Sequence, residues 1–282
     1  MQKTSVEHIK SKINVLNRFF GEMMIEDITA DSVQQFITSR ADESRAKKTV
    51  KEDLAVLKEL LDSAVYDGLI TVNPAKDRRV KNTAKAGSGT KALTREQAAD
   101  ILANIPSLSD PRERCLIALL AYTSCRREEV LGLKWNAVDF EKHLIHIRQA
   151  VVFADNDTVV KDTKMMQSVR SLPMSAALEQ ILAECRQEFG YVIAGEYGGS
   201  IAKKDYRALW ASLKSHIELY GMTAINFRTT FATLAIASGV DLKTTQTLMG
   251  HSTPEITLAI YAKQEASALD HAMDRITAYL AT

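Results

Sequence analysis

Apolar residues near the N-terminus recur every three to four positions, which is the spacing of one face of an amphipathic helix. The first stripe consists of Val6, Ile9, Ile13, Leu16 and Phe19/Phe20. A second, shorter stripe consists of Val33, Phe36 and Ile37. It follows Thr29 and Asp31, and either side chain could cap the start of that helix. The pattern therefore predicts a long helix followed by a short one.

A third stripe predicts a helix from about residue 46 to residue 67. Its apolar face consists of Val50, Leu54, Leu57, Leu60/Leu61 and Ala64/Val65. Gly68 suits the left-handed conformation that often ends a helix, and Pro74 pushes the residue before it out of the helical region. We therefore expect residues 1–75 to form a small helical bundle and residues 76–91 to form an interdomain linker.

The chain beyond residue 91 mixes helical and strand patterns. Thr94-Arg-Glu-Gln97 is a capping box, which predicts the start of one helix, and Asp110-Pro predicts the start of a second. The uninterrupted apolar run 115–122 is typical of a fully buried segment. β-Branched residues between 144 and 160, with a turn at 154–157, predict antiparallel strands, and 168–174 predicts a third. From residue 175 onward the pattern is helical again.

Length and composition agree with these elements. The chain has 282 residues, more than one ordinary domain, and only 12 glycines and 5 prolines, so few positions break a helix. The expected fold is mainly α with a small antiparallel β-sheet. It has two domains: the helical bundle of residues 1–75 and an α+β domain of residues 92–282.

Several classes of protein are excluded or disfavoured by what the sequence lacks. No apolar run approaches the length of a membrane span, and three cysteines without a CxxC motif favour a reducing cytoplasmic compartment. Neither of the glycine-rich loops that cradle nucleotide phosphates occurs, so a nucleotide-driven enzyme is disfavoured. His143 and His146 would point to opposite faces of a strand, so we expect no metal site there.

Charge is unevenly distributed although the net charge is only +1. Residues 1–91 carry 16 Lys/Arg against 13 Asp/Glu, a net charge of +3, and the rest of the chain is −2. Within the linker, residues 76–91 hold six basic residues and one Asp. Such a concentration of positive charge beside a helical bundle favours contact with nucleic-acid phosphates.

Four segments, in order along the chain, resemble the motifs of the tyrosine recombinase (phage integrase) family. They are Thr123-Ser-Cys-Arg126-Arg-Glu-Glu129-Val-Leu-Gly-Leu-Lys-Trp135, Lys164-Met-Met-Gln-Ser-Val-Arg170-Ser-Leu-Pro-Met174, Asn226-Phe-Arg228-Thr-Thr-Phe-Ala-Thr-Leu234, and Leu248-Met-Gly250-His251-Ser252 with Tyr261 ten residues beyond the histidine. The helical bundle and the basic linker also match this family. The resemblance therefore covers nearly the whole chain.

The resemblance implies a site-specific DNA recombinase, an integrase that cleaves and rejoins strands through a 3′-phosphotyrosyl intermediate. Arg126 and Arg228 would bind the phosphate oxygens, because guanidinium groups make paired, charge-assisted hydrogen bonds to phosphate. Tyr261 would be the nucleophile, and Lys164, with Lys161 as the alternative, would protonate the leaving 5′-hydroxyl. His251 would hydrogen-bond a phosphate oxygen. The supporting residue would be Glu129, which would orient its neighbours.

The family likeness also implies partners. The two domains would form a clamp around double-stranded DNA, with phosphate contacts from Lys47, Lys48, Arg78, Arg79, Lys81 and Lys85. An amphipathic helix at about 264–281 would dock onto a neighbouring protomer, giving tetramers on paired sites. Host DNA-bending or directionality factors could assist in integrating or excising a phage or other mobile element. No cofactor and no metal are expected, and the enzyme would be cytoplasmic, associated with the nucleoid when bound to DNA.

One departure from the family pattern affects chemistry. Ile225 stands where the family usually has a histidine, three residues before the second arginine, and its side chain can neither donate nor accept a proton. It motivates one alternative, a family member that binds DNA without cleaving it. A second alternative is strand nicking and resealing like that of a type IB topoisomerase. We expect activity to be retained, because both arginines, the lysine and the tyrosine are present together.

Overall fold

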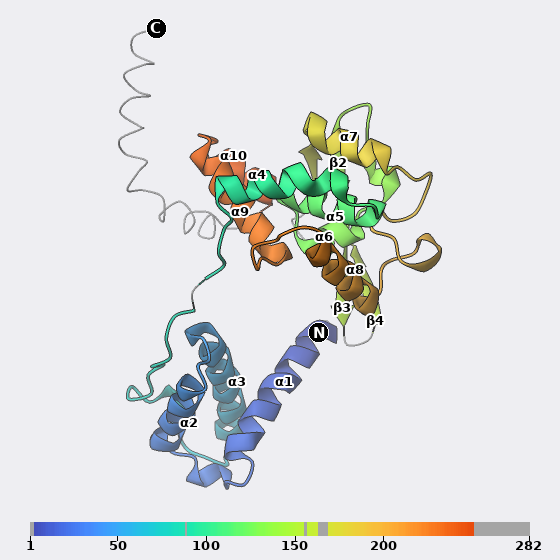
Figure 1. Cartoon of the computed structure of the whole chain (residues 1–282). Coiled ribbons are helices and arrows are strands. Elements are labelled where there is room, and N and C mark those ends of the chain that lie inside the picture. The colour runs from blue at the N-terminus through green and yellow to red at the C-terminus, as the bar shows by residue number, and fades with distance from the viewer. Residues whose placement is uncertain (1–2, 88, 155–156, 163–168, 251–282) are drawn as a thin grey trace, which may run out of the picture. The chain divides into compact units, whose positions relative to one another are not determined.

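The computed structural model describes residues 3–87, 89–154, 157–162 and 169–250 (Figure 1). The chain divides into two compact units, Met1–Gly89 and Thr90–Thr282. Each unit has its own hydrophobic core. The core of the first unit contains Leu16 and Phe20 of the first stripe, all of the second, and Val50, Leu54, Leu57 and Leu61 of the third, whereas Leu60 is exposed. Lys164, His251, Tyr261 and the segment 264–281 lie outside the described residues.

The first unit is a three-helix bundle (Figure 1). Its helices are α1 (Lys3–Phe20), α2 (Ala30–Asp42) and α3 (Lys47–Tyr66), with short 3₁₀ turns at Ile25–Asp27 and Pro74–Lys76. Thr29, and not Asp31, caps α2, because its side chain accepts a hydrogen bond from the Ser32 amide. The rings of Phe19, Phe20 and Phe36 pack against one another at centroid distances of 4.8–5.4 Å, which joins α1 to α2.

A buried carboxylate fixes the three helices to one another. Asp53 of α3 is fully buried, and its Oδ2 accepts hydrogen bonds from Arg40 Nε and Nη2 of α2, both at 3.0 Å. The Nζ of Lys12, on α1, lies 2.8 Å from Asp53 Oδ1. Because an ionised carboxylate is costly to bury without partners, these three residues are interdependent.

Most of the segment 76–91 packs on the bundle instead of crossing freely between the units. Ala84 is buried in the core of the first unit. The Lys81 amide donates to the Gln34 side chain at 2.8 Å, and the Lys47 amide, at the start of α3, donates to the Lys85 carbonyl at 2.8 Å. Alanine at 84 supplies an apolar anchor within the otherwise polar, basic stretch, and the boundary between the units lies at Gly89 and Thr90.

The second unit is mostly helical. Its α-helices are α4 (Arg95–Asn104), α5 (Pro111–Tyr122), α6 (Arg127–Gly132), α7 (Ala176–Glu184), α8 (Lys203–His216), α9 (Ala224–Ala237) and α10 (Leu242–Met249), with 3₁₀ turns at Ile105–Ser107, Trp135–Ala137 and Glu196–Gly198. Thr94 and Gln97 form the expected capping box at the start of α4. Of the apolar run 115–122, residues 115–120 are buried as predicted and Ala121 and Tyr122 are half-buried, so α5 lies at the centre of this unit.

The strands form two antiparallel sheets. The first sheet has the order β1 (Val138–Asp139), β2 (Leu144–Ile147), β5 (Arg170–Pro173), and the second pairs β3 (Gln149–Ala154) with β4 (Asp157–Asp162). The apolar run that reads as one strand is divided at Arg148, so its two halves join different sheets. In the first sheet Ile145 pairs with Leu172, and both side chains are buried.

Close packing places α6 directly on the second sheet. At Gly132, in the last turn of α6, a Cβ atom would lie 2.6 Å from the Gln149 carbonyl oxygen of β3. Only glycine allows this approach, so the residue at the end of α6 sets the distance between that helix and the β3–β4 hairpin. Among the described residues, no helix is long and apolar enough to cross a membrane.

Candidate active site

Arg126 stands at the turn between α5 and α6. The hydroxyl of Thr123 donates to the Leu119 carbonyl and accepts the Cys125 amide at 3.1 Å, which bends the chain sharply between the two helices. Arg126 is therefore the residue that precedes α6. Its backbone amide donates to Glu129 Oε2 at 2.9 Å, and its Nη1 donates to Glu129 Oε1 at 3.0 Å. The Arg126 side chain remains about one-third exposed, so the protein does not enclose it.

Glu129 is almost entirely buried and stays ionised. Its side chain is 4% exposed. Burial alone would raise the pKa of Glu129, but hydrogen bonds and charge from Arg170 and Arg126 outweigh burial and lower that pKa below its ordinary value. The carboxylate is thus a fixed negative centre between two arginines.

Arg228 approaches the same turn from α9. The residue is 5% exposed; its Nη1 donates to the Ser124 carbonyl, and its Nη2 donates to the Met249 carbonyl at 2.6 Å. Burial and then the positive charge of Arg126 lower the pKa of Arg228 to about 10. The guanidinium is still charged at neutral pH, but it is held near other cations at an energetic cost. A bound anion would remove that cost.

Arg170 belongs to the same cluster, and sequence reasoning assigned it no role. It lies on β5 with a side chain only 10% exposed, and its Nη2 and Nη1 donate to Glu129 Oε2 and Oε1 at 2.8 and 3.2 Å. Burial would lower the pKa of Arg170, but Glu129 outweighs burial and raises it. A charged residue on a short strand is usually exposed, so the strand pattern gave no signal. The only indication of a role for Arg170 in the sequence was its place in the motif segment that begins at Lys164.

The C-terminal end of α10 is attached to this cluster. The Leu248 carbonyl accepts hydrogen bonds from Arg170 Nε at 3.2 Å and from the Ser124 hydroxyl. Gly250 follows with a φ of +59°, and a Cβ atom there would lie 3.1 Å from Arg170 Nη1. The left-handed φ and the close approach of the Arg170 side chain both favour glycine at this position. The last helical carbonyls, which no helical amide can reach, are thus bound by cationic side chains.

The structure brings Arg126, Glu129 and Arg228 together, as the sequence motifs imply. Lys164, His251 and Tyr261 lie outside the described residues, so their roles stay predictions. The alternative lysine, Lys161, lies on β4 opposite Ala150 of β3. Ile225 lies in the first turn of α9, three residues before Arg228, and its side chain is 54% exposed.

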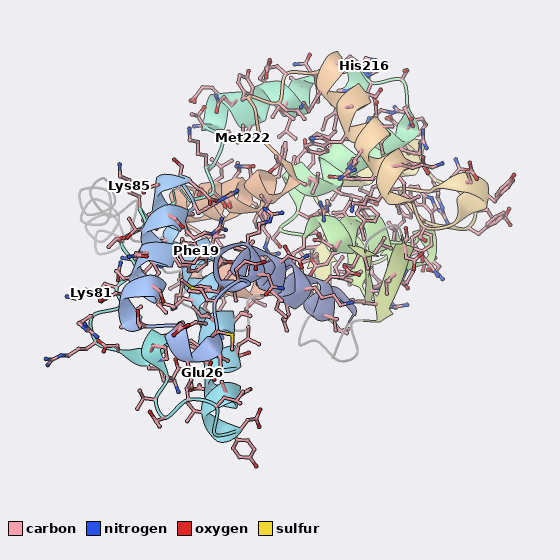
Figure 2. The ribbon with its side chains drawn as sticks, turned by 90° about the horizontal axis from the view of Figure 1, so that it is seen from below. Phe19, Glu26, Lys81, Lys85, His216 and Met222 are labelled. Atoms are coloured by element: carbon pink, nitrogen blue, oxygen red, sulfur yellow. The ribbon has the colours of Figure 1, made fainter. Side chains whose placement is uncertain are left out.

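The residues expected to bind DNA fall into two sets. Lys47 and Lys48 begin α3. The Lys85 carbonyl accepts the Lys47 amide, and the side chain of Asn82, next to Lys81, donates to the Lys47 carbonyl, so the segment 81–85 passes this end of the helix. Figure 2 shows Lys81 and Lys85 along one edge of the first unit. All four side chains are exposed. Arg79 differs, because its guanidinium binds Asp77 at 3.0 and 3.1 Å; Arg78 beside it is exposed.

Comparison with known proteins identifies the family. The profile of the Phage integrase family matches residues 91–267, which is more than half of the chain and includes all four motifs. The chain belongs to the phage integrase family. This family comprises the tyrosine recombinases, so the protein is a site-specific recombinase, an enzyme that cleaves and rejoins DNA. Neither alternative raised by the sequence is favoured by its relatives.

The relatives and the similar structures agree with this assignment. A "Tyrosine recombinase XerC-like" protein of Caldanaerobacter subterraneus subsp. tengcongensis is 27% identical over 88% of this chain and 71% of its own length. Tyrosine recombinase XerC of Chlamydia trachomatis serovar L2 is 28% identical over 81% of this chain and 71% of its own. The integrase of transposon Tn1549, in complex with transposon right-end DNA, superposes with a TM-score of 0.81 over 98% of this chain and 95% of its own, at 20% identity.

The fold is also that of lambda integrase. One chain from the crystal structure of a lambda integrase dimer bound to a COC' core site superposes with a TM-score of 0.68 over 92% of this chain and 89% of its own, at 16% identity. At this level of identity the likeness is one of fold. It covers both units of the chain.

The arginine cluster predicts an anion site that can be detected without DNA. Sulfate should stabilise the wild-type protein against thermal unfolding, by about 1.4 kcal/mol at a concentration tenfold above its dissociation constant. The stabilisation should be constant from pH 6 to 9 and should decline above pH 10, because Arg228 then loses its proton. The measurement is the unfolding temperature in sulfate against sodium chloride of equal ionic strength.

Arg126→Gln should abolish this sulfate-specific shift, because Arg126 is the partly exposed member of the cluster. The matched control is Arg114→Gln. Arg114 lies on α5 of the same unit and pairs with Glu184 at 3.3 Å, away from the cluster. A sulfate shift that survives in Arg126→Gln would place the anion elsewhere.

The two sets of basic residues predict different effects on DNA binding. Replacing Lys47, Lys81 and Lys85 by alanine together should weaken binding to any sequence, and the slope of log K against log salt should fall by about 0.9 for each DNA phosphate that the protein no longer neutralises. Arg79→Ala should change the slope less, since Asp77 already holds that guanidinium. Fluorescence anisotropy across a salt series measures the affinity and the salt slope of each variant. An equal fall in slope from Arg79→Ala alone would contradict the division into two sets.

Proposed function

We propose that the arginine cluster binds the scissile phosphate of a recombination site and that strand cleavage occurs there. The observation that carries this proposal is a cluster of three arginines at one buried carboxylate: Arg126 and Arg170 bond Glu129, and Arg228 is held beside them by the Ser124 carbonyl. Three guanidinium groups against one carboxylate leave a net positive charge in a largely buried site. Arg126 and Arg228 are the two that would contact the non-bridging oxygens, as charge develops there during transfer.

Tyr261 would attack the phosphorus. The tyrosine loses its hydroxyl proton to water as its oxygen bonds phosphorus, the bond from phosphorus to the 5′-oxygen breaks, and the 3′ end stays attached to the enzyme. Lys164, or Lys161 from β4, would donate a proton to the departing 5′-oxygen, and His251 would donate a hydrogen bond to the phosphate. The phosphotyrosyl bond resembles the phosphodiester in energy, so a 5′-hydroxyl from another strand can reverse the step without a nucleotide cofactor.

The substrate would be double-stranded DNA carrying paired recombination sites. The two units would enclose the duplex as a clamp, with the lysines at the start of α3 on its backbone. Family membership supports integration or excision of a phage or other mobile element, with host DNA-bending or directionality factors as assistants. The protein would act in the cytoplasm and associate with the nucleoid when bound to DNA.

Assembly into a tetramer on paired sites would use the C-terminal segment. The second unit has an open apolar cavity of about 400 Å³ between α4, α5 and α9, lined by residues that include Leu102, Tyr122, Phe231 and Leu234. The segment 264–281 has an apolar stripe of Ala266, Leu269, Met273, Ile276 and Leu280 at helical spacing. An apolar groove and an apolar stripe suit each other, so this segment of one copy would occupy the cavity of the next.

Covalent trapping tests the proposed reaction. The protein is incubated with a nicked half-site from its own genomic flanks, from which the cleaved strand end diffuses away. We expect a denaturation-resistant protein–DNA adduct with the wild-type protein and none with Tyr261→Phe, because only the hydroxyl is removed. Electrophoresis under denaturing conditions measures the adduct.

Tyr261→Phe should bind the same half-site with unchanged affinity. DNA binding by the wild-type protein without any adduct, on a site established as correct, would contradict cleavage. An adduct that persists in Tyr261→Phe would contradict the choice of nucleophile but not the family.

Removal of residues 264–282 tests assembly. The truncated protein should bind a single site almost as tightly as the full chain but should form far less of the paired-site complex. Phe231→Glu, which places a charge in the cavity, should have the same effect. Native electrophoresis with one-site and two-site DNA separates these outcomes. An equal loss of single-site and paired-site complexes would show that the segment serves the fold or DNA binding instead.

A further inference from the structure

The hydrogen bonds to Glu129 include two from Arg170, a residue that has no role in the proposed cleavage step. Each of its two oxygens accepts two hydrogen bonds. Oε1 accepts from Arg126 Nη1 at 3.0 Å and from Arg170 Nη1 at 3.2 Å. Oε2 accepts from the Arg126 amide at 2.9 Å and from Arg170 Nη2 at 2.8 Å. A carboxylate has about four acceptor positions, so Arg126 and Arg170 together fill all of them.

This arrangement leaves most of the Arg126 guanidinium free of Glu129. Arg126 commits one hydrogen of Nη1 to the carboxylate, and its Nε and Nη2 are not needed there. The side chain is also partly exposed, so the protein does not enclose it. Without Arg170, two acceptor positions of a buried, charged carboxylate would be empty, and such groups are costly to leave unpaired. The Arg126 side chain already bonds Oε1 and has further donors with which to fill them.

Arg170 also joins the two halves of the site. Its Nε donates to the Leu248 carbonyl at 3.2 Å, and its guanidinium lies against Gly250. Gly250 immediately precedes His251 in the sequence. One side chain thus contacts both the carboxylate that orients Arg126 and the end of the helix that leads to His251. Lysine could satisfy one of these partners but not all, because it lacks the planar fork.

We infer that Arg170 is a positioning residue for strand cleavage: it saturates Glu129 so that the outer donors of Arg126 remain available to the scissile phosphate, and it fixes the turn before His251. This inference rests on the proposed function. Arg170 itself is nearly buried and uses both ends of its guanidinium within the protein, so it acts through Arg126 and the end of α10.

The test compares single-turnover cleavage of the nicked half-site at saturating protein. Arg170→Gln should cleave at least about tenfold more slowly, since displacement of a group that binds the phosphate by about 1 Å can cost on the order of 10²-fold. Its affinity for the half-site should stay within about twofold of the wild-type value. Arg114→Gln, the half-buried arginine control of the same unit, should leave the cleavage rate unchanged.

A double variant separates positioning from general support of the fold. In Arg170→Gln, Glu129 would draw the outer donors of Arg126 toward itself. Removing the charge of Glu129 should then make those donors available again. Glu129→Gln/Arg170→Gln should therefore cleave faster than Arg170→Gln alone. Loss of fold would give the opposite order, because two buried polar groups are then disturbed. Thermal unfolding of each variant confirms that the comparison is made on folded protein.

The outcomes separate this inference from the proposed function. A wild-type protein that forms no Tyr261-dependent adduct contradicts the proposed function. A wild-type protein that forms the adduct, with Arg170→Gln cleaving at the same rate or the double variant slower than Arg170→Gln, overturns the role of Arg170 alone. If Arg170→Gln is too unstable to assay, Arg170→Lys with and without Glu129→Gln gives the same comparison.

Discussion

The carboxylate of Glu129 is the interaction on which the site depends. Arg126, Arg170 and Arg228 carry like charges and would repel one another if they were brought together alone. The buried, ionised carboxylate accepts four hydrogen bonds from Arg126 and Arg170 and so holds these two arginines side by side. The third, Arg228, has no bond to Glu129 among those described; backbone carbonyls hold it, and burial together with the positive charge of Arg126 lowers its pKa. The excess positive charge is what a phosphate would neutralise.

The fold serves to bring four chain segments together in the arginine cluster around that carboxylate. The turn after α5 supplies Arg126, β5 supplies Arg170, α9 supplies Arg228, and the end of α10 supplies the carbonyls of Leu248 and Met249. Because each arginine also binds a backbone carbonyl or the shared carboxylate, the guanidinium groups are fixed before any DNA is present. Electrostatic groups that are already in place do not have to reorganise during the reaction. Such preorganisation is usually the largest contribution to the rate.

Sequence patterns predicted much of this fold for clear reasons. The capping box at Thr94, the helices of the bundle and the buried run in α5 depend on local spacing, and the structure has each of them. The division of the strand run at Arg148 and the packing of Ala84 on the bundle depend on distant contacts, which local patterns do not contain. The motifs predicted Arg126, Glu129 and Arg228 as neighbours. The sequence did not indicate a role for Arg170, because that role depends on its hydrogen bond to Glu129, 41 residues away in the chain. The roles of Lys164, His251 and Tyr261 stay predictions.

The central claim is that Arg126 and Arg228 act on the negative charge of the scissile phosphate. The most direct measurement uses DNA in which a methyl group replaces one non-bridging oxygen of that phosphate, which removes the charge but keeps the shape. Single-turnover cleavage by Arg126→Ala and Arg228→Ala is compared with wild type on this DNA and on natural DNA. The account predicts a large defect on natural DNA and a much smaller one on the neutral substrate. Equal defects on both substrates would contradict it.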